Sequence, residues 1–319
     1  MVFLVTIDVE EDNWAHYDSA PALSNIERLP ELQKLFDRYH VKPTYLITYP
    51  VATEKRSNSI LRKLMEEGRC EIGAHVHPWN TPPFSEERTD ENTMLCNLEK
   101  DLQYRKIETL HEEICKNFQM EPKSFRSGRW GFSRSVAENI YRVGYRVDTS
   151  VSPYYSWEKY YGPDFSDRSP KPQYIHLGEH GQNDSHLLEV PASIGFLQPN
   201  FAYRNRVLKK ITNSRLKHLR MVGVLDKLRI VNKVMLSPEM ASGKEMILLA
   251  ESIQREGIDF LNMFFHSSTL VAGLTPFTKS AEDEKTFLRR IEEFLEYLAA
   301  SNIKSITLSE SYPLVPVHG

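Results

Sequence analysis

Two histidines separated by one residue, His75 and His77, end a short apolar run in CEIGAHVHP, with a proline directly after the second. Imidazole nitrogens are common ligands of divalent transition metals. A His-x-His pair alone is weak evidence for a metal site, because two partly buried histidines at a turn are the more common outcome. The other polar residues that the fold brings to the same place decide between the two interpretations.

Acidic and basic side chains end other apolar, strand-like runs in the chain. Asp8 and Glu10 end VFLVTIDVE, and Arg126 ends KSFR. Asp148 lies late in YRVDTSV, and His266 ends DFLNMFFH. In an α/β barrel the carboxyl ends of the strands form one rim, which carries the active site. We therefore expect all of these residues to lie on one rim with the two histidines.

Such a rim suits metal-assisted hydrolysis. One carboxylate and two imidazoles form a three-ligand site that leaves positions open for water and a substrate carbonyl. A second carboxylate can act as general base, an arginine beside it keeps it ionised, and a protonated histidine opposite can supply a proton to the leaving group. TIDVEED carries four acids in seven residues, and this crowding of like charge favours a bound cation.

Structural interpretations of the same residues stay open. Asp8 and Asp148 could cap turns, and Arg126 with Arg129 could simply pair with the acids. His266 could be a buried core histidine with its hydrogen bonds satisfied. A group of aromatic residues could form a platform for a sugar ring or could be loop packing: Trp79, Trp130, Tyr154, Tyr155 and Trp157.

The alternation of strand-like and helix-like patterns along the chain predicts the fold that positions the rim residues. Eight short runs rich in β-branched or aromatic residues are expected strands, at 2–8, 43–49, 70–76, 123–128, 145–151, 186–193, 259–266 and 304–308. Amphipathic helical patterns alternate with them, at 26–40, 57–68, 92–118, 132–145, 246–257 and 280–302. Ser242 and Glu245 predict a capping box before one of these helices. This alternation predicts one α/β domain over residues 1–319, a distorted (β/α) barrel with seven or eight strands.

Two segments interrupt the alternation. Residues 152–185 are rich in Pro, Gly, Tyr and Asp, which is typical of a long ordered loop beside a site. Residues 203–235 hold nine Lys or Arg between Arg204 and Arg229 against the single acid Asp226, which indicates a basic helical insertion. This insertion is either a solvated surface element or an arm that faces an anionic substrate or a membrane surface.

Composition excludes some classes of protein. A formal net charge of −3 over 319 residues argues against general nucleic-acid binding. The cysteine count of three is odd, which favours free thiols in a reducing compartment. No stretch approaches 18 uninterrupted apolar residues, so we expect no transmembrane segment. The start of the chain lacks the pattern of a secretory signal, so we expect a cytoplasmic protein. The oligomeric state stays open.

The rim residues also lie in stretches that resemble the motifs of the polysaccharide deacetylases of carbohydrate esterase family 4. TIDVEEDNW (6–14) is similar to the first motif, in an Asp-x-Glu variant, and EIGAHVHP resembles the second, with its histidines two residues closer than usual. FRSGRWG (125–131), VDTSVSPY (147–154) and NMFFHS (262–267) are similar to the third, fourth and fifth motifs, and ITLSE is typical of the closing strand. The motifs occur in the order found in the family.

The resemblance implies a role for each rim residue. Glu10, His75 and His77 would bind a divalent metal, most simply zinc, although cobalt or nickel would fit. The paired residues on each strand point the same way only if that strand stays extended through the second residue.

The same resemblance implies that Asp8 is the catalytic base, that Arg126 tunes it, and that His266 is the general acid. Asp148 would orient or tune that acid, and a backbone N–H near Trp130 would bind the oxyanion. Asp8 and Glu10 could also exchange their roles.

These roles predict a metal-dependent hydrolase that deacetylates an N-acetylated sugar, a polysaccharide or its precursor. Two alternatives remain: a relative that hydrolyses another C–N bond, such as that of a cyclic amide, without needing a metal, and an inactive carbohydrate- or membrane-binding module that uses residues 203–235. The sugar and its linkage to a polymer, lipid or nucleotide stay open.

Overall fold

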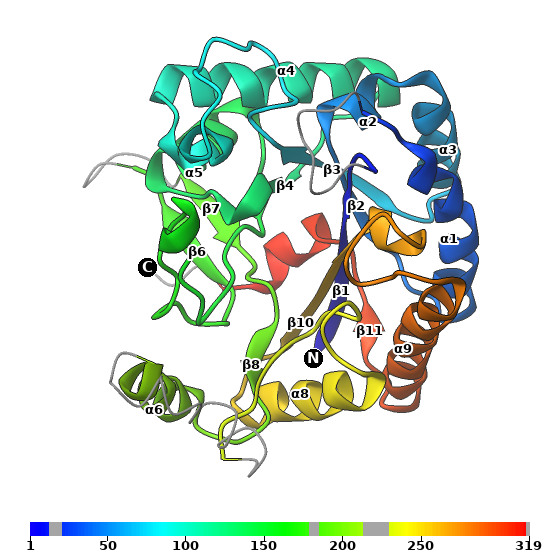
Figure 1. Cartoon of the computed structure of the whole chain (residues 1–319), viewed down its shortest axis with the longest axis vertical. Coiled ribbons are helices and arrows are strands. Elements are labelled where there is room, and N and C mark those ends of the chain that lie inside the picture. The colour runs from blue at the N-terminus through cyan, green and yellow to red at the C-terminus, as the bar shows by residue number, and fades with distance from the viewer. Residues whose placement is uncertain (13–20, 179–184, 213–229, 317–319) are drawn as a thin grey trace.

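A mostly parallel sheet forms the frame of the protein in the computed structural model, which describes residues 1–12, 21–178, 185–212 and 230–316. All eight expected strands are present, and three further short strands join them (Figure 1). The expected strands are β1 (Val2–Val9), β2 (Thr44–Ile47), β3 (Glu71–Val76), β4 (Ser124–Ser127), β5 (Val147–Asp148), β7 (His186–Glu189), β10 (Phe260–His266) and β11 (Lys304–Ser305). The additional strands are β6 (Gln173–His176), β8 (Ile194–Phe196) and β9 (Lys233–Met235).

The order of the main sheet is β10-β1-β2-β3-β4-β5-β7-β6, with β11 beside the first residues of β1. Every neighbouring pair from β10 to β7 is parallel, and β6 alone runs antiparallel, at the edge. A parallel arrangement carries the carboxyl ends of β1, β3, β4 and β10 to the same rim. The expected α/β barrel-like fold is therefore confirmed.

The barrel is distorted where β10 meets the far side of the sheet. Among the described strands, no ladder joins β10 to β6. Irregular backbone spans this region instead: Ser193 donates its N–H to the carbonyl of Asn262, and Phe264 donates to the carbonyl of Leu236, each at 3.1 Å. β8 begins directly after Ser193 and β9 ends directly before Leu236, and the two strands pair as a small second sheet.

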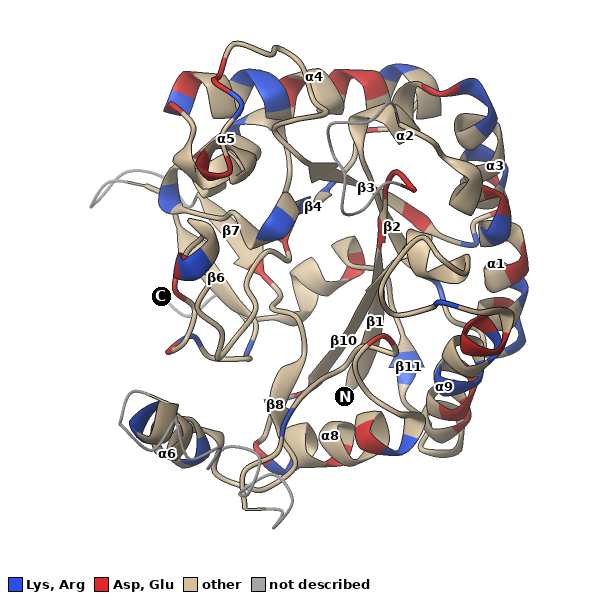
Figure 2. Ribbon diagram, viewed as in Figure 1, with Lys and Arg blue, Asp and Glu red and all other residues tan. Residues whose placement is uncertain are grey.

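Helices pack around the sheet and carry many of the charged residues that Figure 2 colours. They are α1 (Leu29–Arg38), α2 (Tyr49–Thr53), α3 (Lys55–Glu66), α4 (Lys100–Phe118), α5 (Arg134–Val143), α6 (Phe201–Thr212), α8 (Gly243–Arg255) and α9 (Ala281–Ala300). The expected capping box is confirmed at the start of α8, where Ser242 and Glu245 bond each other's backbone N–H groups. The helix expected over 92–118 begins only at Lys100, because the preceding residues form 3-10 turns at Glu91–Thr93 and Leu95–Asn97.

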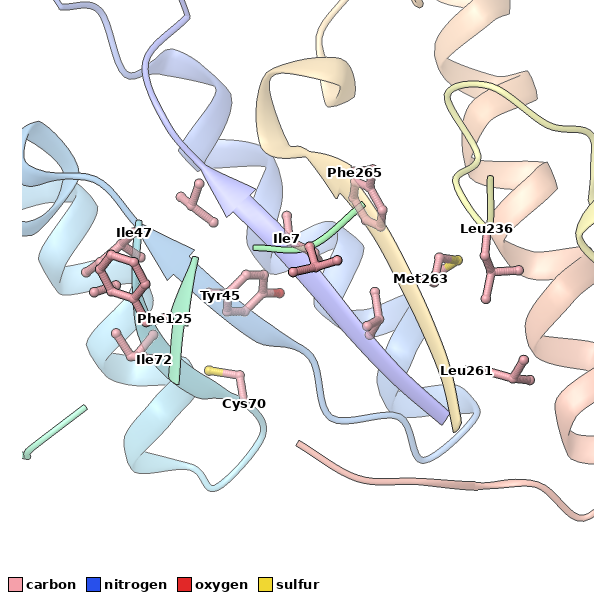
Figure 3. Close-up of a cluster of buried hydrophobic side chains, with 14 of the residues drawn as sticks. Ile7, Tyr45, Ile47, Cys70, Ile72, Phe125, Leu236, Leu261, Met263 and Phe265 are labelled. Atoms are coloured by element: carbon pink, nitrogen blue, oxygen red, sulfur yellow. The ribbon is translucent and has the colours of Figure 1, made fainter. Parts of the chain in front are cut away.

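The core lies between the strands and these helices. Ile7, Tyr45, Ile72, Phe125 and Phe265 are fully buried, and Figure 3 shows them clustered along β1, β2, β3, β4 and β10. Strands that are covered on both faces have nearly continuous apolar sequences, which is why the sequence pattern located them.

The two interrupting segments contain more strand than expected. The predicted loop 152–185 includes β6, and the predicted helical insertion 203–235 begins within α6 but ends in β9, which pairs antiparallel with β8. Residues 213–229 of that insertion lie outside the described part of the chain. Within the described residues, no helix combines the length and the apolar character that a membrane span requires.

Candidate active site

A cavity of about 530 Å³ opens at the rim where β1, β3, β4 and β10 end. Six of the seven residues that the sequence singled out line it: Asp8, Glu10, His75, His77, Arg126 and His266. The seventh, Asp148, is fully buried and does not line the cavity. The strands that carry these side chains are far apart in the sequence, so the sheet order is what brings the side chains together.

The two histidines point to the same side of β3. His75 lies in β3 and His77 directly follows its last residue, Val76, and the two rings lie with centroids 4.5 Å apart. His75 Nδ1 lies 3.1 Å from the carbonyl oxygen of Arg126, so this nitrogen donates and Nε2 keeps its lone pair toward the acids.

Glu10 lies close to both rings. Its Oε2 is 3.1 Å from His77 Nε2 and 3.9 Å from His75 Nε2, and one ligand atom from each of the three residues lies within 4.8 Å of the others. In a tetrahedral zinc site with bonds of roughly 2.1 Å, ligand atoms lie roughly 3.4 Å apart. The spacing of these atoms therefore suits one shared divalent cation.

The chemistry of the three groups also fits a cation. Burial lowers the pKa of His75 and of His77 to about 4, so both imidazoles are neutral near pH 7 and can donate a lone pair. Burial raises the pKa of Glu10, and its Oε1 is buried with no hydrogen-bond partner among the described residues. A bound cation would satisfy this oxygen and stabilise the ionised carboxylate.

Gly128 allows the ends of β3 and β4 to approach each other. A Cβ at this position would lie 2.2 Å from His77 Nδ1, far inside van der Waals contact. The next two residues, Arg129 and Trp130, take left-handed backbone conformations with φ of 53° and 62°. Such conformations are uncommon outside glycine and persist where the surrounding structure enforces them, frequently at functional sites.

Asp8 is held by Arg126, whose Nη1 donates to Asp8 Oδ1 at 2.6 Å. The same guanidinium donates to Thr6 Oγ1 and to the carbonyl oxygen of Thr149, so its orientation is fixed inside the barrel. Burial alone would raise the pKa of Asp8, but Arg126, His75 and His266 outweigh it and hold that pKa below its ordinary value. Asp8 is thus ionised near neutral pH.

The other two acids at the end of β1 hydrogen-bond residues outside this cluster, although the charge of Glu11 acts on His77. Glu11 accepts hydrogen bonds from Thr48 Oγ1 at 2.9 Å and from Asn80 Nδ2 at 2.7 Å. Asp12 accepts from the backbone N–H and the hydroxyl of Ser24 at 2.9 and 2.7 Å. The crowding of four acids in the sequence therefore reflects two rim carboxylates and two structural ones.

His266 has a carboxylate partner that the sequence analysis missed. Its Nδ1 lies 3.1 Å from Oε1 of Glu239, which also accepts the backbone N–H of His266 and the hydroxyl of Thr269. Its Nε2 lies 4.0 Å from Asp8 Oδ2. Burial alone would lower the pKa of His266, but Glu239 and the rim acids raise it to about 10, so the imidazole is protonated. The available signal for Glu239 was the short apolar run Val234–Leu236, which ends in Ser-Pro-Glu.

Asp148, expected to orient His266, makes its bonds elsewhere. Its carboxylate accepts from the hydroxyl of Ser150 at 2.7 Å and from its N–H at 2.9 Å, and Glu189 is its neighbour on β7. Burial raises the pKa of both carboxyls, that of Glu189 most strongly, because two neighbouring buried carboxyls disfavour two negative charges. The pair lies beneath Arg126, whose charge favours its ionised member.

The aromatic residues divide between the cavity and the packing around it. Trp79, Trp130 and Trp157 line the cavity, and the Trp130 and Trp157 rings are stacked with centroids 6.5 Å apart. Tyr155 stacks behind Trp157 at 6.0 Å, whereas the Tyr154 ring packs against Phe196. Three of the five candidates could therefore contact a ligand in the cavity.

Solved structures share this fold at low sequence identity. A protein from Mycobacterium smegmatis described as a polysaccharide deacetylase aligns over 98% of this chain and 89% of its own, with a TM-score of 0.60 and 13% identity. Puue allantoinase aligns over 98% and 89%, with a TM-score of 0.52 and 9% identity. The 4-alpha-glucanotransferase from Thermococcus litoralis aligns over 100% of this chain but 41% of its own, with a TM-score of 0.56 and 13% identity. No protein-family model and no curated protein matches the sequence.

Proposed function

We propose that the protein is a metal-dependent hydrolase that removes the acetyl group from an N-acetylated sugar, as part of a polysaccharide or its precursor. The observation that carries this proposal is one cavity that holds three groups: the Glu10–His75–His77 cluster, the Asp8–Arg126 pair and the His266–Glu239 pair. Amide hydrolysis needs an electrophile, a base and an acid, and each group suits one of these functions.

Glu10, His75 and His77 would hold the divalent ion. When bound, such an ion polarises the amide carbonyl and lowers the pKa of water. The nitrogen and oxygen ligand set favours zinc, cobalt or nickel. The base and the acid come from the protein itself.

Asp8 is the proposed general base. It takes the proton of the attacking water on Oδ2, because Oδ1 is occupied by the Arg126 hydrogen bond. Arg126 keeps Asp8 ionised before the reaction and fixes its orientation.

His266 is the proposed general acid. Its Nε2–H lies on the side of the cavity that faces Asp8, so it can donate to the departing amine nitrogen while Asp8 acts on the water. Glu239 holds Nδ1–H and keeps the imidazole protonated until that transfer. A backbone N–H near Trp130 is the proposed oxyanion donor, since the left-handed turn there lies at the cavity wall.

Two further observations support a carbohydrate amide as substrate. Trp130 and Trp157 offer stacked aromatic surfaces beside the cluster, and sugar rings pack well on such surfaces. The motifs resemble those of carbohydrate esterase family 4, in an Asp-x-Glu variant, and one protein with the same fold is described as a polysaccharide deacetylase. We propose membership of that family on these grounds.

The test is release of acetate from a panel of N-acetylated sugars and oligosaccharides. We expect activity that chelation abolishes and that zinc, cobalt or nickel restores. Asp8→Asn should lower kcat/KM by at least roughly a hundredfold, which is typical for loss of a general base. The matched control is Asp12→Asn, the same change at an acid that accepts hydrogen bonds from Ser24 and Asn25, and it should stay close to wild type. Full activity of Asp8→Asn would refute the assignment.

The second candidate function is hydrolysis of another C–N bond, such as that of a cyclic amide. The observation behind it is the shared fold with an allantoinase structure. Allantoin or a hydantoin incubated with the protein distinguishes the two functions. Ring opening without acetate release from any N-acetyl sugar would favour the second candidate.

A further inference from the structure

A second cavity, of about 700 Å³, lies outside the candidate active site and shares no lining residue with it. The loop 167–171, helix α6 and the residues that follow α8 form its walls. Asn205 of α6 is buried and donates to the carbonyl oxygen of Ser166 at 2.8 Å, which fixes the helix against the loop. Phe201 and Tyr154 provide apolar surface in the same cavity.

Positive charge is concentrated around this cavity. Five cationic side chains line it, against two acids, although the whole chain carries a net charge of −3. The cations are Arg168, Lys171, Arg206, Lys209 and Lys210, and Figure 2 shows the blue positions on α6. A cluster of one sign in a concave surface attracts ligands of the opposite sign.

Most of these cations are not neutralised within the protein. Lys209 pairs with Asp167 at 2.7 Å, and the carboxylate of Glu256 accepts the backbone N–H groups of Asn200 and Phe201. The charged groups of the other four side chains make no hydrogen bond or ion pair in the part of the chain that the structure describes: Arg168, Lys171, Arg206 and Lys210. A ligand that offers several anionic oxygens would satisfy them together.

The segment that contains Tyr154 and Trp157 contributes to the walls of both cavities. Tyr154 lines the cationic cavity, and Trp157, three residues later, lines the candidate active site. Lys233 of β9 donates to the Tyr154 carbonyl at 2.9 Å and lies 3.4 Å from the centroid of the Tyr155 ring, so it anchors this loop between the cavities. One extended ligand could follow the loop from one cavity to the other.

We propose that the cationic cavity binds a phosphate or pyrophosphate group, and that this group is part of the substrate on which the rim acts. Arginine and lysine together suit phosphate oxygens, and the apolar surface of Phe201 and Tyr154 suits the remainder of a phosphate ester. The second half of the statement rests on the proposed hydrolase function, whereas the binding of phosphate does not.

The test is calorimetric titration of the full chain with inorganic pyrophosphate at low and moderate salt. Wild-type protein should bind, and the triple variant Lys171→Gln, Arg206→Gln, Lys210→Gln should bind at least tenfold more weakly. The control triple variant Lys34→Gln, Arg105→Gln, Lys244→Gln removes the same charges from exposed sites that line neither cavity, and it should bind as the wild type does. All variants are compared by circular dichroism.

Two further arms separate the possible origins of a signal. The double variant His75→Ala, His77→Ala should still bind pyrophosphate, which excludes binding at a metal on the rim and keeps this result independent of the proposed hydrolase function. Sedimentation with phosphatidylcholine–phosphatidylglycerol vesicles tests whether the phosphate belongs to a lipid. If the wild type binds vesicles but not pyrophosphate, and the first triple variant loses vesicle binding, the cavity is a phosphate site that binds a membrane headgroup. Absence of both kinds of binding, or unchanged binding by that variant, overturns the proposal.

Discussion

Three histidines on the rim differ in protonation because their surroundings differ. Burial lowers the pKa of His75 and His77 to about 4, so they stay neutral, as metal ligands must. Burial would do the same to His266, but the Glu239 carboxylate raises the pKa of His266 to about 10. Residues of one type can therefore serve as ligands and as an acid in the same cavity, because neighbouring charge decides the protonation of each.

Replacing Glu239 tests this assignment of the acid. A general acid must be protonated, so kcat/KM falls as the pH rises through its pKa. Glu239→Gln removes the charge that raises the pKa of His266, and the alkaline limb of the kcat/KM profile should move to lower pH by at least about one unit. Asp148→Asn provides the comparison, and it should leave the limb in place because Asp148 bonds Ser150 and lies beside Glu189. A shift with Asp148→Asn alone would contradict the assignment.

The same pair affects stability in a predictable direction. The folded-state pKa of His266, about 10, lies above the ordinary histidine value of 6.5. The pairing therefore stabilises the fold fully below about pH 6.5 and its contribution is lost as the pH rises through about 10. The pH dependence of thermal unfolding in wild type and Glu239→Gln should accordingly converge at high pH.

At the scale of elements, the ends of β3 and β4 must approach closely for His77 to face Glu10. Gly128 makes this approach possible, because a Cβ there would lie 2.2 Å from His77 Nδ1. Gly128→Ala should displace the imidazole and weaken metal binding by about tenfold or more, the usual effect of disturbing the support of a ligand. Metal content after dialysis against a competing chelator measures this loss.

Gly68 provides the matched control for that substitution. It has a positive φ of 68° and nothing within 4 Å of an added Cβ. Gly68→Ala should therefore lower the free energy of unfolding by about 1 kcal/mol through backbone strain and leave metal affinity unchanged. If both variants lost metal equally, general destabilisation rather than the contact with His77 would be responsible.

Sequence patterns predicted those elements that are buried on both faces. β1, β3, β4 and β10 are almost entirely buried, and the residues at their ends include six that line the rim cavity. β6 was not predicted, because its side chains are partly exposed and it pairs only along the edge. β8 and β9 were not predicted either, and these three-residue strands pair with each other outside the main sheet.

Sequence patterns did not predict which site residues, far apart in the chain, contact each other. Glu239 precedes His266 by 27 residues and lies in a loop after β9, so only the tertiary fold shows that the two side chains meet. The proximity of Asp148 and Glu189 likewise depends on β5 and β7 being neighbours in the sheet. Local sequence predicts where a strand ends, but tertiary packing determines which of several nearby acids contacts a given side chain.

At the scale of the whole molecule, the fold alone does not define the chemistry. Structures described as a deacetylase, an allantoinase and a glucanotransferase share the architecture at 9–13% identity with this chain. The observations specific to this chain are the side chains that line its rim cavity and its cationic cavity beside α6. Function must therefore be argued from these sites.

The central claim is that Glu10, His75 and His77 bind one divalent cation, and anomalous diffraction tests it most directly. Crystals grown with zinc, with data collected on both sides of the zinc absorption edge, should show one anomalous peak roughly 2.0–2.2 Å from a carboxylate oxygen of Glu10 and from a ring nitrogen of each histidine. The same crystals of a His77→Ala variant should show a weaker peak or none. A wild-type map without a peak between these three side chains would contradict the account.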